Sequence, residues 1–129
     1  MADIGMTLVG RLLSYPGLTA LVGTRIFPGF LPQGTAKPAM YIEQTGFTPV
    51  SAMGTDSGIE ETDWDICIIA DSYAILKAVQ AQAKAAVQRW RTSTGFIVMD
   101  TFIRDIHDGF VDETQEHLST ISIIIKHQT

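Results

Sequence analysis

The side chains with the clearest capacity for chemistry lie in one short segment, Arg104-Asp105-Ile106-His107-Asp108. Asp105 and His107 are two residues apart, so on a β-strand they would share a face and could together bind a divalent metal ion. A metal site needs three or four converging ligands, and His117 is the one further candidate, across a hairpin. We therefore expect a polar strand end running into a turn. A small metal-dependent enzyme built on Asp105, His107 and His117 is the alternative.

A second group of polar side chains, Glu61, Asp63 and Asp65, alternates along a segment with strand character. Paired carboxylates can serve acid–base catalysis when their surroundings separate their pKa values. No apolar pocket or fixed partner that would separate the pKa values can be argued from this sequence. We expect these three carboxylates to form a solvated face or the charged wall of a pore.

Other catalytic signatures are missing from the sequence. There is no Gly-x-Ser-x-Gly elbow, and no Gly-Lys-Ser/Thr follows the glycines at 29 and 34, so neither a hydrolase triad nor a phosphate loop is supported. Cys67 lies in an apolar segment and is expected to be an inert core residue. Trp64 and Trp90 are expected in the core, and His127 in solvent. We predict that the protein is not an enzyme and binds no cofactor.

The composition fits one globular domain over residues 1–129, with 46% hydrophobic and 18% charged residues. A formal net charge of -5 argues against a dedicated nucleic-acid-binding protein, which usually needs a basic face. A mean hydropathy of +0.18 is high for a small monomer and suggests surplus apolar surface at a subunit interface. The single cysteine excludes an internal disulfide and fits folding in a reducing cytoplasm. No secretory signal and no membrane-spanning run is expected.

The first half of the chain predicts helices followed by strands around an irregular excursion. Apolar residues at helical spacing predict a helix over 3–15, and a further helical turn over 18–22. A short strand over 25–27 leads into 28–38, where prolines and glycines recur too often for regular structure. A second strand is expected over 39–47.

The second half predicts a loop, three strands and the longest helix. Small polar residues over 48–58 predict a mobile loop, and alternation over 59–70 predicts a strand. A helix over 72–91, capped by Asp71 or Ser72, is followed by strands over 95–106 and 117–127. The segment between these last strands is acidic and contains Asp108-Gly109, a good turn dipeptide. The predicted fold is α+β, with an antiparallel or mixed sheet of about five strands, a long helix packed on one face and an N-terminal helix.

The first third of the chain resembles a family of small phage tail-completion proteins, the tail terminators or tail-to-head joining proteins of long-tailed phages and phage-like particles. The resemblance rests on four motifs: Leu12-Leu13, Leu18-x-x-Leu21-Val22-Gly23-x-Arg25-Ile26, Pro32-Gln33-Gly34 and Pro38-x-x-Tyr41-Ile42. The remainder of the chain matches the family in its order of elements.

The resemblance implies a structural virion protein. Such proteins form six-fold rings that cap the tail tube, stop its growth and join it to the head-completion (stopper) protein, while DNA passes through the centre without specific binding. It also implies a place at the head–tail junction, assembly in the bacterial host cytoplasm and no membrane contact. Another neck protein, such as the stopper itself, is the nearest alternative.

The resemblance also implies roles for particular residues. The acidic face of Glu61, Asp63 and Asp65 would line the lumen, where like charges let DNA slide. The segments 28–38 and 48–58 would be docking surfaces. The contact residues implied for other subunits or partners are Arg25, Phe30, Gln33, Pro49, Met53 and Asp56.

Overall fold

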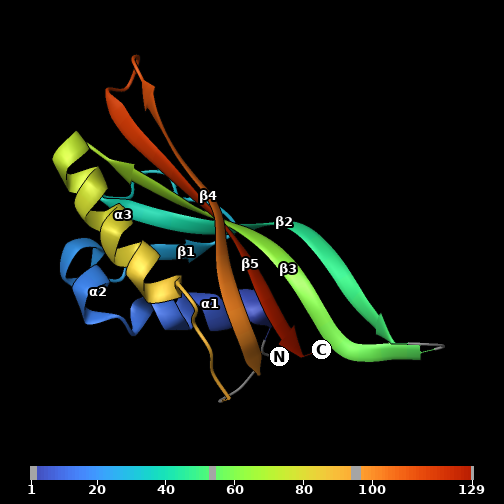
Figure 1. The fold of residues 1–129 in the computed structure, drawn as a ribbon. Coiled ribbons are helices and arrows are strands. Elements are labelled where there is room, and N and C mark those ends of the chain that lie inside the picture. The colour runs from blue at the N-terminus through green and yellow to red at the C-terminus, as the bar shows by residue number, and fades with distance from the viewer. Residues whose placement is uncertain (1–2, 53–54, 94–96, 129) are drawn as a thin grey trace.

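The structure is a computed structural model that describes residues 3–52, 55–93 and 97–128. It contains three helices and five strands in an α+β arrangement within these residues, as the sequence predicts (Figure 1). The elements follow the order α1 (Ile4–Leu13), α2 (Pro16–Val22), β1 (Ile26–Pro28), β2 (Ala39–Ala52), β3 (Thr55–Ala70), α3 (Tyr73–Val87), β4 (Val98–Val111) and β5 (Glu116–Gln128).

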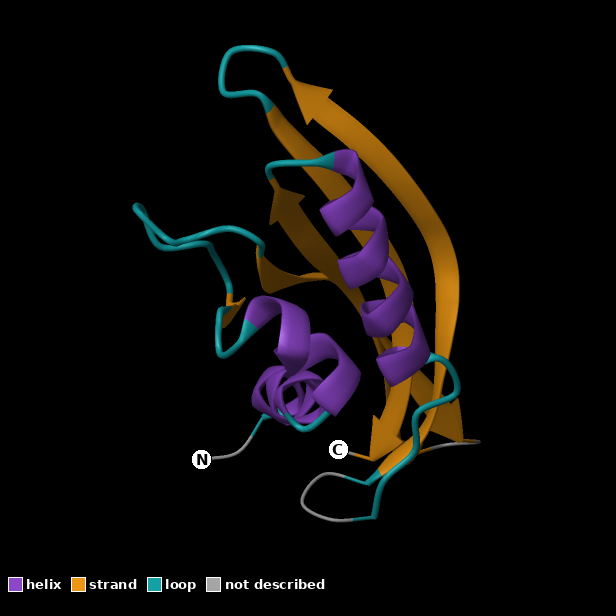
Figure 2. Cartoon of the chain, turned by 90° about the vertical axis from the view of Figure 1, so that its left-hand side faces the viewer, coloured by secondary structure: helices purple, strands orange, loops and turns teal. Residues whose placement is uncertain are grey.

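The five strands form one mixed sheet in the order β1-β2-β3-β5-β4. The short strand β1 runs parallel to β2, and every other neighbouring pair is antiparallel. All three helices lie on the same side of the sheet, with α3 crossing it and α1 and α2 beside α3 (Figures 1 and 2). None of the described helices is long and apolar enough to cross a bilayer.

The hydrophobic core lies between the helices and the sheet. Along β3 and β5 every second side chain is buried, which is the period of two that places alternate residues on one face of a strand. On α3 the buried stripe repeats at three- and four-residue intervals, as an amphipathic helix requires. Fully buried side chains at the centre include Leu8, Leu12, Ile66, Leu76, Val79, Ile121 and Ile123. Trp64 and Trp90 are each only 8% exposed, so the prediction that both belong to the core is confirmed.

Helices α1 and α3 both begin at side-chain caps, and Ser72 is one of the two caps that the sequence predicts for α3. Asp3 Oδ1 accepts a hydrogen bond from the Met6 amide at 2.8 Å, and Ser72 Oγ accepts one from the Ile75 amide at 3.2 Å. Each bond satisfies an amide of the first helical turn that has no partner within the helix. Helix α3 ends at Val87, four residues earlier than predicted, and Arg89 then adopts a left-handed backbone with φ of 57°.

The predicted loop over 48–58 is wrong. Strands β2 and β3 run through this segment as a long hairpin, paired at Thr48 with Glu61 and at Ala52 with Thr55. The hairpin projects beyond the helices (Figure 1). In this projecting part no helix packs on the strands, so neither strand face needs apolar side chains. The small and polar residues that suggest a loop are therefore equally compatible with a strand.

The predicted turn at Asp108-Gly109 is also wrong. Strand β4 continues through both residues to Val111, where it still pairs with β5, and the turn lies at 112–115. Asp108 is held by side chains of α3, described below, and this tertiary contact outweighs the local turn preference of an Asp-Gly pair. The β4–β5 hairpin is therefore longer than the sequence suggests, and its acidic residues are divided between strand and turn.

Candidate functional site

The face of the sheet that points away from the helices is called the open face here. No described helix covers it, and it carries the polar residues that the sequence marks as functional candidates. Glu61, Asp63 and Asp65 all lie on this face of β3, where each is partly exposed and alternates with a buried neighbour. The prediction that these three carboxylates share one face is confirmed.

Basic and hydroxyl groups on the neighbouring strands partly balance this charge. Arg104 Nη1 lies 3.1 Å from Asp63 Oδ2, and Lys126 of β5 is the cross-strand partner of Glu61. Ser122 Oγ donates a hydrogen bond of 2.8 Å to Asp65 Oδ1. The contacts with Arg104 and Ser122 hold Asp63 and Asp65 in place without burying them.

The open face nevertheless remains acidic. Glu43 of β2 lies directly opposite Asp65, and like charges in that position repel each other. Asp105 adds a further exposed carboxylate from β4. Among the residues named here, five carboxylates stand beside two basic side chains, Arg104 and Lys126. The arrangement suits the passage or exclusion of a polyanion better than its capture.

A glycine leaves room for one of these carboxylates. Gly46 is the partner of Asp63 and follows a bulge in β2. A Cβ atom at Gly46 would lie 2.7 Å from Asp63 Oδ2, which is closer than side chains tolerate. The absence of a side chain at Gly46 therefore positions Asp63, and with it the ion pair to Arg104.

The predicted core position of Cys67 is wrong, because its side chain lies partly exposed on the open face beside Tyr41 and Thr120. Partial burial raises the pKa of the Cys67 thiol and raises the pKa of Tyr41 to about 12. Both groups line a shallow depression of about 270 Å³ that also contacts Ile69 and Leu118. A raised thiol pKa keeps Cys67 protonated at neutral pH, so the expectation of an unreactive side chain agrees with its surroundings.

The candidate metal ligands are divided between the two faces of the sheet. Asp105 Oδ2 lies 3.3 Å from His107 Nδ1 on the open face, so these two share a face as predicted. His117 lies on the helix side, with its ring 4.7 Å from that of Phe110 and 6.2 Å from that of Tyr73. The prediction that His117 could join the pair is wrong, because His117 is paired with Phe110 on the helix side, whereas His107 is paired with Thr120 on the open face. Among the described residues no three His, Cys, Asp or Glu side chains are close enough to hold a metal ion.

The predicted solvent exposure of His127 is wrong. The side chain is 2% exposed on the helix side of β5, and its Nδ1 lies 2.8 Å from the Gln128 carbonyl oxygen. The strand continues one residue beyond the predicted end, so His127 takes the next buried position after Ile125.

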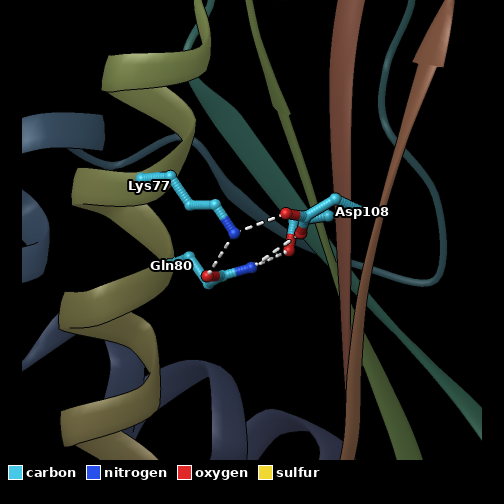
Figure 3. Close-up of polar contacts among 4 residues, drawn as sticks. Lys77, Gln80 and Asp108 are labelled. Carbon is cyan, nitrogen blue, oxygen red and sulfur yellow. Dashed lines mark hydrogen bonds and ion pairs between the residues drawn. The ribbon is translucent and has the colours of Figure 1, made fainter.

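A polar cluster that sequence reasoning missed joins α3 to the β4–β5 hairpin (Figure 3). Lys77 Nζ pairs with Asp108 Oδ2, and Gln80 Nε2 donates to Asp108 Oδ1 at 2.8 Å and to the hydroxyl of Ser119 at 2.6 Å. The hydrogen bond from Lys77 holds the pKa of Asp108 below its ordinary value. Lys77 and Gln80 are three residues apart, so the sequence does show that they share a helix face. Their partner Asp108 was not recognised because it was predicted to lie in a turn.

The start of β5 has a second polar anchor. Lys37, at the end of the irregular segment, pairs with Glu116 and lies 3.6 Å from Asp71. The hydrogen bond from Lys37 holds the pKa of Glu116 below its ordinary value. Segment 29–38 is thereby attached to the same end of the sheet as the β4–β5 turn.

The residues proposed as contacts fall into two places. Phe30 and Gln33 are exposed in the irregular segment, with Phe30 68% exposed, and Pro49 is exposed on the projecting β2–β3 hairpin. Arg25 Nε donates to the Pro38 carbonyl oxygen at 2.9 Å, so its observed partner is a backbone group rather than an acid. Met53 and the side chain of Asp56 lie outside the described residues.

Comparison with known proteins identifies the class of this fold. Residues 6–126 match the family model described as Tail completion protein gp17. A chain from the virion of a native gene transfer agent particle has the same fold, with a TM-score of 0.80 and 16% sequence identity over 95% of this chain and 92% of that chain. No curated protein sequence matches this chain significantly.

The family match spans nearly the whole chain, and the protein therefore belongs to the tail completion protein gp17 family. The resemblance drawn from its first third is confirmed. At 16% identity, the likeness to the gene transfer agent virion chain shows a shared fold and nothing more.

Proposed function

We propose that this protein is the tail terminator of a long-tailed phage or phage-like particle. It would form a six-fold ring that caps the tail tube, stops its growth and joins it to the head-completion protein. The observation that carries the proposal is the family match over residues 6–126. Its fold likeness to a gene transfer agent virion chain supports the same reading.

The open face is the part of the molecule that suits the lumen of such a ring. Glu61, Asp63 and Asp65 present fixed carboxylates there, and DNA that meets a like-charged wall slides without binding. The exposed segment 29–38, with Phe30 and Gln33, and the β2–β3 hairpin, with Pro49, would contact the tube, the head-completion protein or neighbouring subunits. Arg25 would support such a contact indirectly, because it holds Pro38 at the base of that segment.

Negative-stain imaging of the purified protein mixed with tail tubes tests the proposal. We expect closed rings with a central hole at the tube ends, and tubes of limited length when the protein is present during their assembly. Binding to isolated head necks without any effect on tubes would assign the chain to the head-completion protein instead. A protein that ignores both would overturn the proposal.

The lumen assignment has its own test. The triple variant Glu61→Gln/Asp63→Asn/Asp65→Asn should fold and cap tubes like the wild type, because all three side chains are partly exposed. We expect it to retain DNA in the ring, measured as slower DNA ejection from assembled particles. Asp71→Asn removes an exposed carboxylate elsewhere and serves as the control. A triple variant that fails to fold would make these residues structural.

A further inference from the structure

A notch at one end of the helical layer has no role in the function described so far. It has a volume of about 310 Å³ and is lined by Thr7, Gly10, Arg11, Ser14, Trp90, Arg91 and Thr92. The lining is mainly polar: two guanidinium groups and three hydroxyl side chains surround the edge of one tryptophan. Such a lining favours a carboxylate-bearing ligand over an apolar one.

Gly10 is the observation that indicates close approach by another molecule. It is exposed in the interior of α1, and a Cβ atom added there would meet no atom within 4 Å. A glycine inside a helix is less favourable than alanine by about 1 kcal/mol, so a close packing contact at such a position would explain its presence. Gly5 has such a reason within the chain, because a Cβ atom there would lie 2.8 Å from the Trp64 ring. The described residues supply none for Gly10.

Positive charge gathers around this notch. Three of the nine basic residues, Lys84, Arg89 and Arg91, lie at the C-terminal end of α3 or just after it, and Arg11 of α1 is a fourth beside them. Arg11 reaches that end by donating from Nε to the Ala86 carbonyl oxygen at 2.8 Å. Asp100 is the single ion-pair partner found for these residues within the described chain, at 2.6 Å from Arg89 and 3.5 Å from Arg91. Arg91 is left 62% exposed and available to another carboxylate.

The opposite end of the molecule carries a fixed acidic turn. Residues 112–115 join β4 to β5, and within them Gln115 Nε2 donates to the Asp112 carbonyl oxygen while Thr114 Oγ1 donates to Glu116. Asp112 and Glu113 are exposed, and neither forms an ion pair with another described residue. The turn thus presents two carboxylates on a backbone that its own side chains hold in shape, which lowers the entropic cost of binding.

The acidic turn cannot reach the notch of its own chain. Twelve residues of strand separate Asp100, beside the notch, from Asp112, a distance of roughly 40 Å along an extended strand. Figures 1 and 2 show the turn beyond one end of α3 and the chain after Val87 at the other end. Any contact between these two surfaces must therefore join different molecules.

We propose that the notch of one subunit binds Asp112 and Glu113 of a second copy of this chain. The inference rests on the proposed ring and specifies its subunit contact. Each copy offers one turn and one notch, so the contact is head-to-tail, and a head-to-tail contact generates a closed ring when its rotation closes. Gly10 leaves room for the incoming backbone, and Arg91 and Arg11 supply the charge that the two carboxylates require.

Two complementary variants test this contact. Gly10→Leu fills the notch and should raise the thermal unfolding midpoint, since leucine favours a helix more than glycine does. Asp112→Asn/Glu113→Gln removes the charge of the turn and keeps its shape. Ala85→Leu, an exposed position of α3 outside the notch lining, is the matched control. Association is measured by sedimentation velocity and negative stain in the absence of tubes.

We expect rings for the wild type and for Ala85→Leu, and monomers for each of the other variants alone. An equimolar mixture of Gly10→Leu with Asp112→Asn/Glu113→Gln retains one intact turn and one intact notch per pair, so it should give dimers and nothing larger. Raising the ionic strength should dissociate the wild-type rings, because the contact is electrostatic.

The outcomes separate this inference from the proposed function. Rings formed by either variant alone would overturn the contact and leave the terminator proposal standing. A wild type that stays monomeric at high concentration also overturns the contact, since a turn and a notch need no tube to meet. Failure of the protein to cap tubes would overturn the proposed function. That outcome is measured separately, by negative-stain imaging of the protein mixed with tail tubes.

Discussion

The two long hairpins of the sheet are held in different ways. The β4–β5 hairpin is attached to the rest of the molecule by side chains, through Lys77 and Gln80 of α3 and through Lys37 of the irregular segment. The β2–β3 hairpin extends past the helical layer beyond about Gln44, where β3 still pairs with β5 as far as Ile59. Beyond Ile59 its outermost part is held by its own backbone ladder, with Ser51 opposite Asp56. Phe47 of this hairpin is 55% exposed.

The difference separates a structural hairpin from an interaction hairpin. A hairpin bonded to a helix contributes to the stability of the fold, and its turn is presented in one position. A hairpin with few tertiary contacts contributes little to stability, and binding surfaces are commonly formed by such segments. The outer part of β2–β3 is therefore the better candidate for docking to a partner of different sequence.

Shortening the β2–β3 hairpin should have the largest effect on function. Removing residues 51–58 and joining Val50 to Ile59 through Asn-Gly keeps the register, because these two residues are paired and a two-residue turn suits an antiparallel pair. The pairs of Ile59 and Glu60 with β5 are kept. We expect the unfolding free energy to change by about 1 kcal/mol or less, since the described strand residues that are removed pair only with one another. Joining of tails to heads, measured by an in vitro complementation assay, should be abolished.

The same variant can also contradict the comparison. If it joined tails to heads as well as the wild type does, the hairpin would not be a docking surface. If it failed to fold, the hairpin would be structural, like β4–β5. Rings of normal size from the shortened chain would show that the loss lies in docking and not in subunit assembly.

The largest loss of stability is expected where both hairpins meet the core. Ile121 is fully buried on β5, between Ile66 of β3 and Ile106 of β4. Ile121→Ala should cost about 2–5 kcal/mol of unfolding free energy, from lost burial and the cavity that remains. Phe47→Ala on the projecting hairpin should cost less than about 0.5 kcal/mol. Urea denaturation of both variants measures the difference, and similar losses would show that the outer hairpin is packed after all.

The fold was predictable from the sequence wherever an element buries one face, because burial produces a periodic pattern of apolar residues. Alternation over 59–70 and the apolar stripe of the helix after Ser72 follow from one buried face, and both elements are found. Strand β3 begins four residues before the predicted strand, and α3 ends four residues before the predicted end. The hairpin ends could not be predicted in the same way. Beyond the helices there is no burial pattern to read, and local turn preferences at 48–58 and Asp108-Gly109 were outweighed by ladder pairing and by α3.

The candidate site was predictable to the same extent. The shared face of Glu61, Asp63 and Asp65 follows from strand periodicity alone. The partners Arg104 and Ser122 come from strands that are distant in sequence, and the order β3-β5-β4 that brings them together is a tertiary property. The position of His117 was mispredicted for a related reason. The face on which it lies depends on the pairing register of β4 with β5, and the turn predicted at Asp108-Gly109 implied a different register.

A smaller effect is expected from the polar contacts that attach β4–β5 to α3. Gln80→Ala removes the hydrogen bonds to Asp108 and to Ser119. Ser119 is only 1% exposed. Leaving a buried hydroxyl without its partner should cost about 1–2 kcal/mol. Gln44→Ala removes an exposed hydrogen bond on the other hairpin, to the Gly46 carbonyl oxygen, and should cost less than about 0.5 kcal/mol.

Hydrogen exchange locates the Gln80 effect within the molecule. The amides of β4 nearest to Asp108 should exchange faster in Gln80→Ala, while those of β2 and β3 keep their wild-type rates. Equal acceleration throughout the sheet would mean that the contact stabilises the whole fold and that the two hairpins do not differ in this respect.

The smallest effect is expected from pH, and it acts on the β4–β5 hairpin alone. The hydrogen bond from Lys77 lowers the pKa of Asp108 in the folded state below its ordinary value of 3.8. A group with a lowered folded pKa stabilises the protein above its unfolded pKa, and this contribution is lost as pH falls through the folded value. The wild type should therefore be more stable than Asp108→Asn from pH 5 to pH 8, with the difference shrinking below about pH 4. Thermal unfolding across this range measures it, and in a Lys77→Met background the difference should be reduced at every pH, because the charged partner of Asp108 is gone. A difference that stayed constant down to pH 2 would assign the effect to side-chain shape rather than to the Asp108 charge, and the attachment of this hairpin would then rest on Gln80.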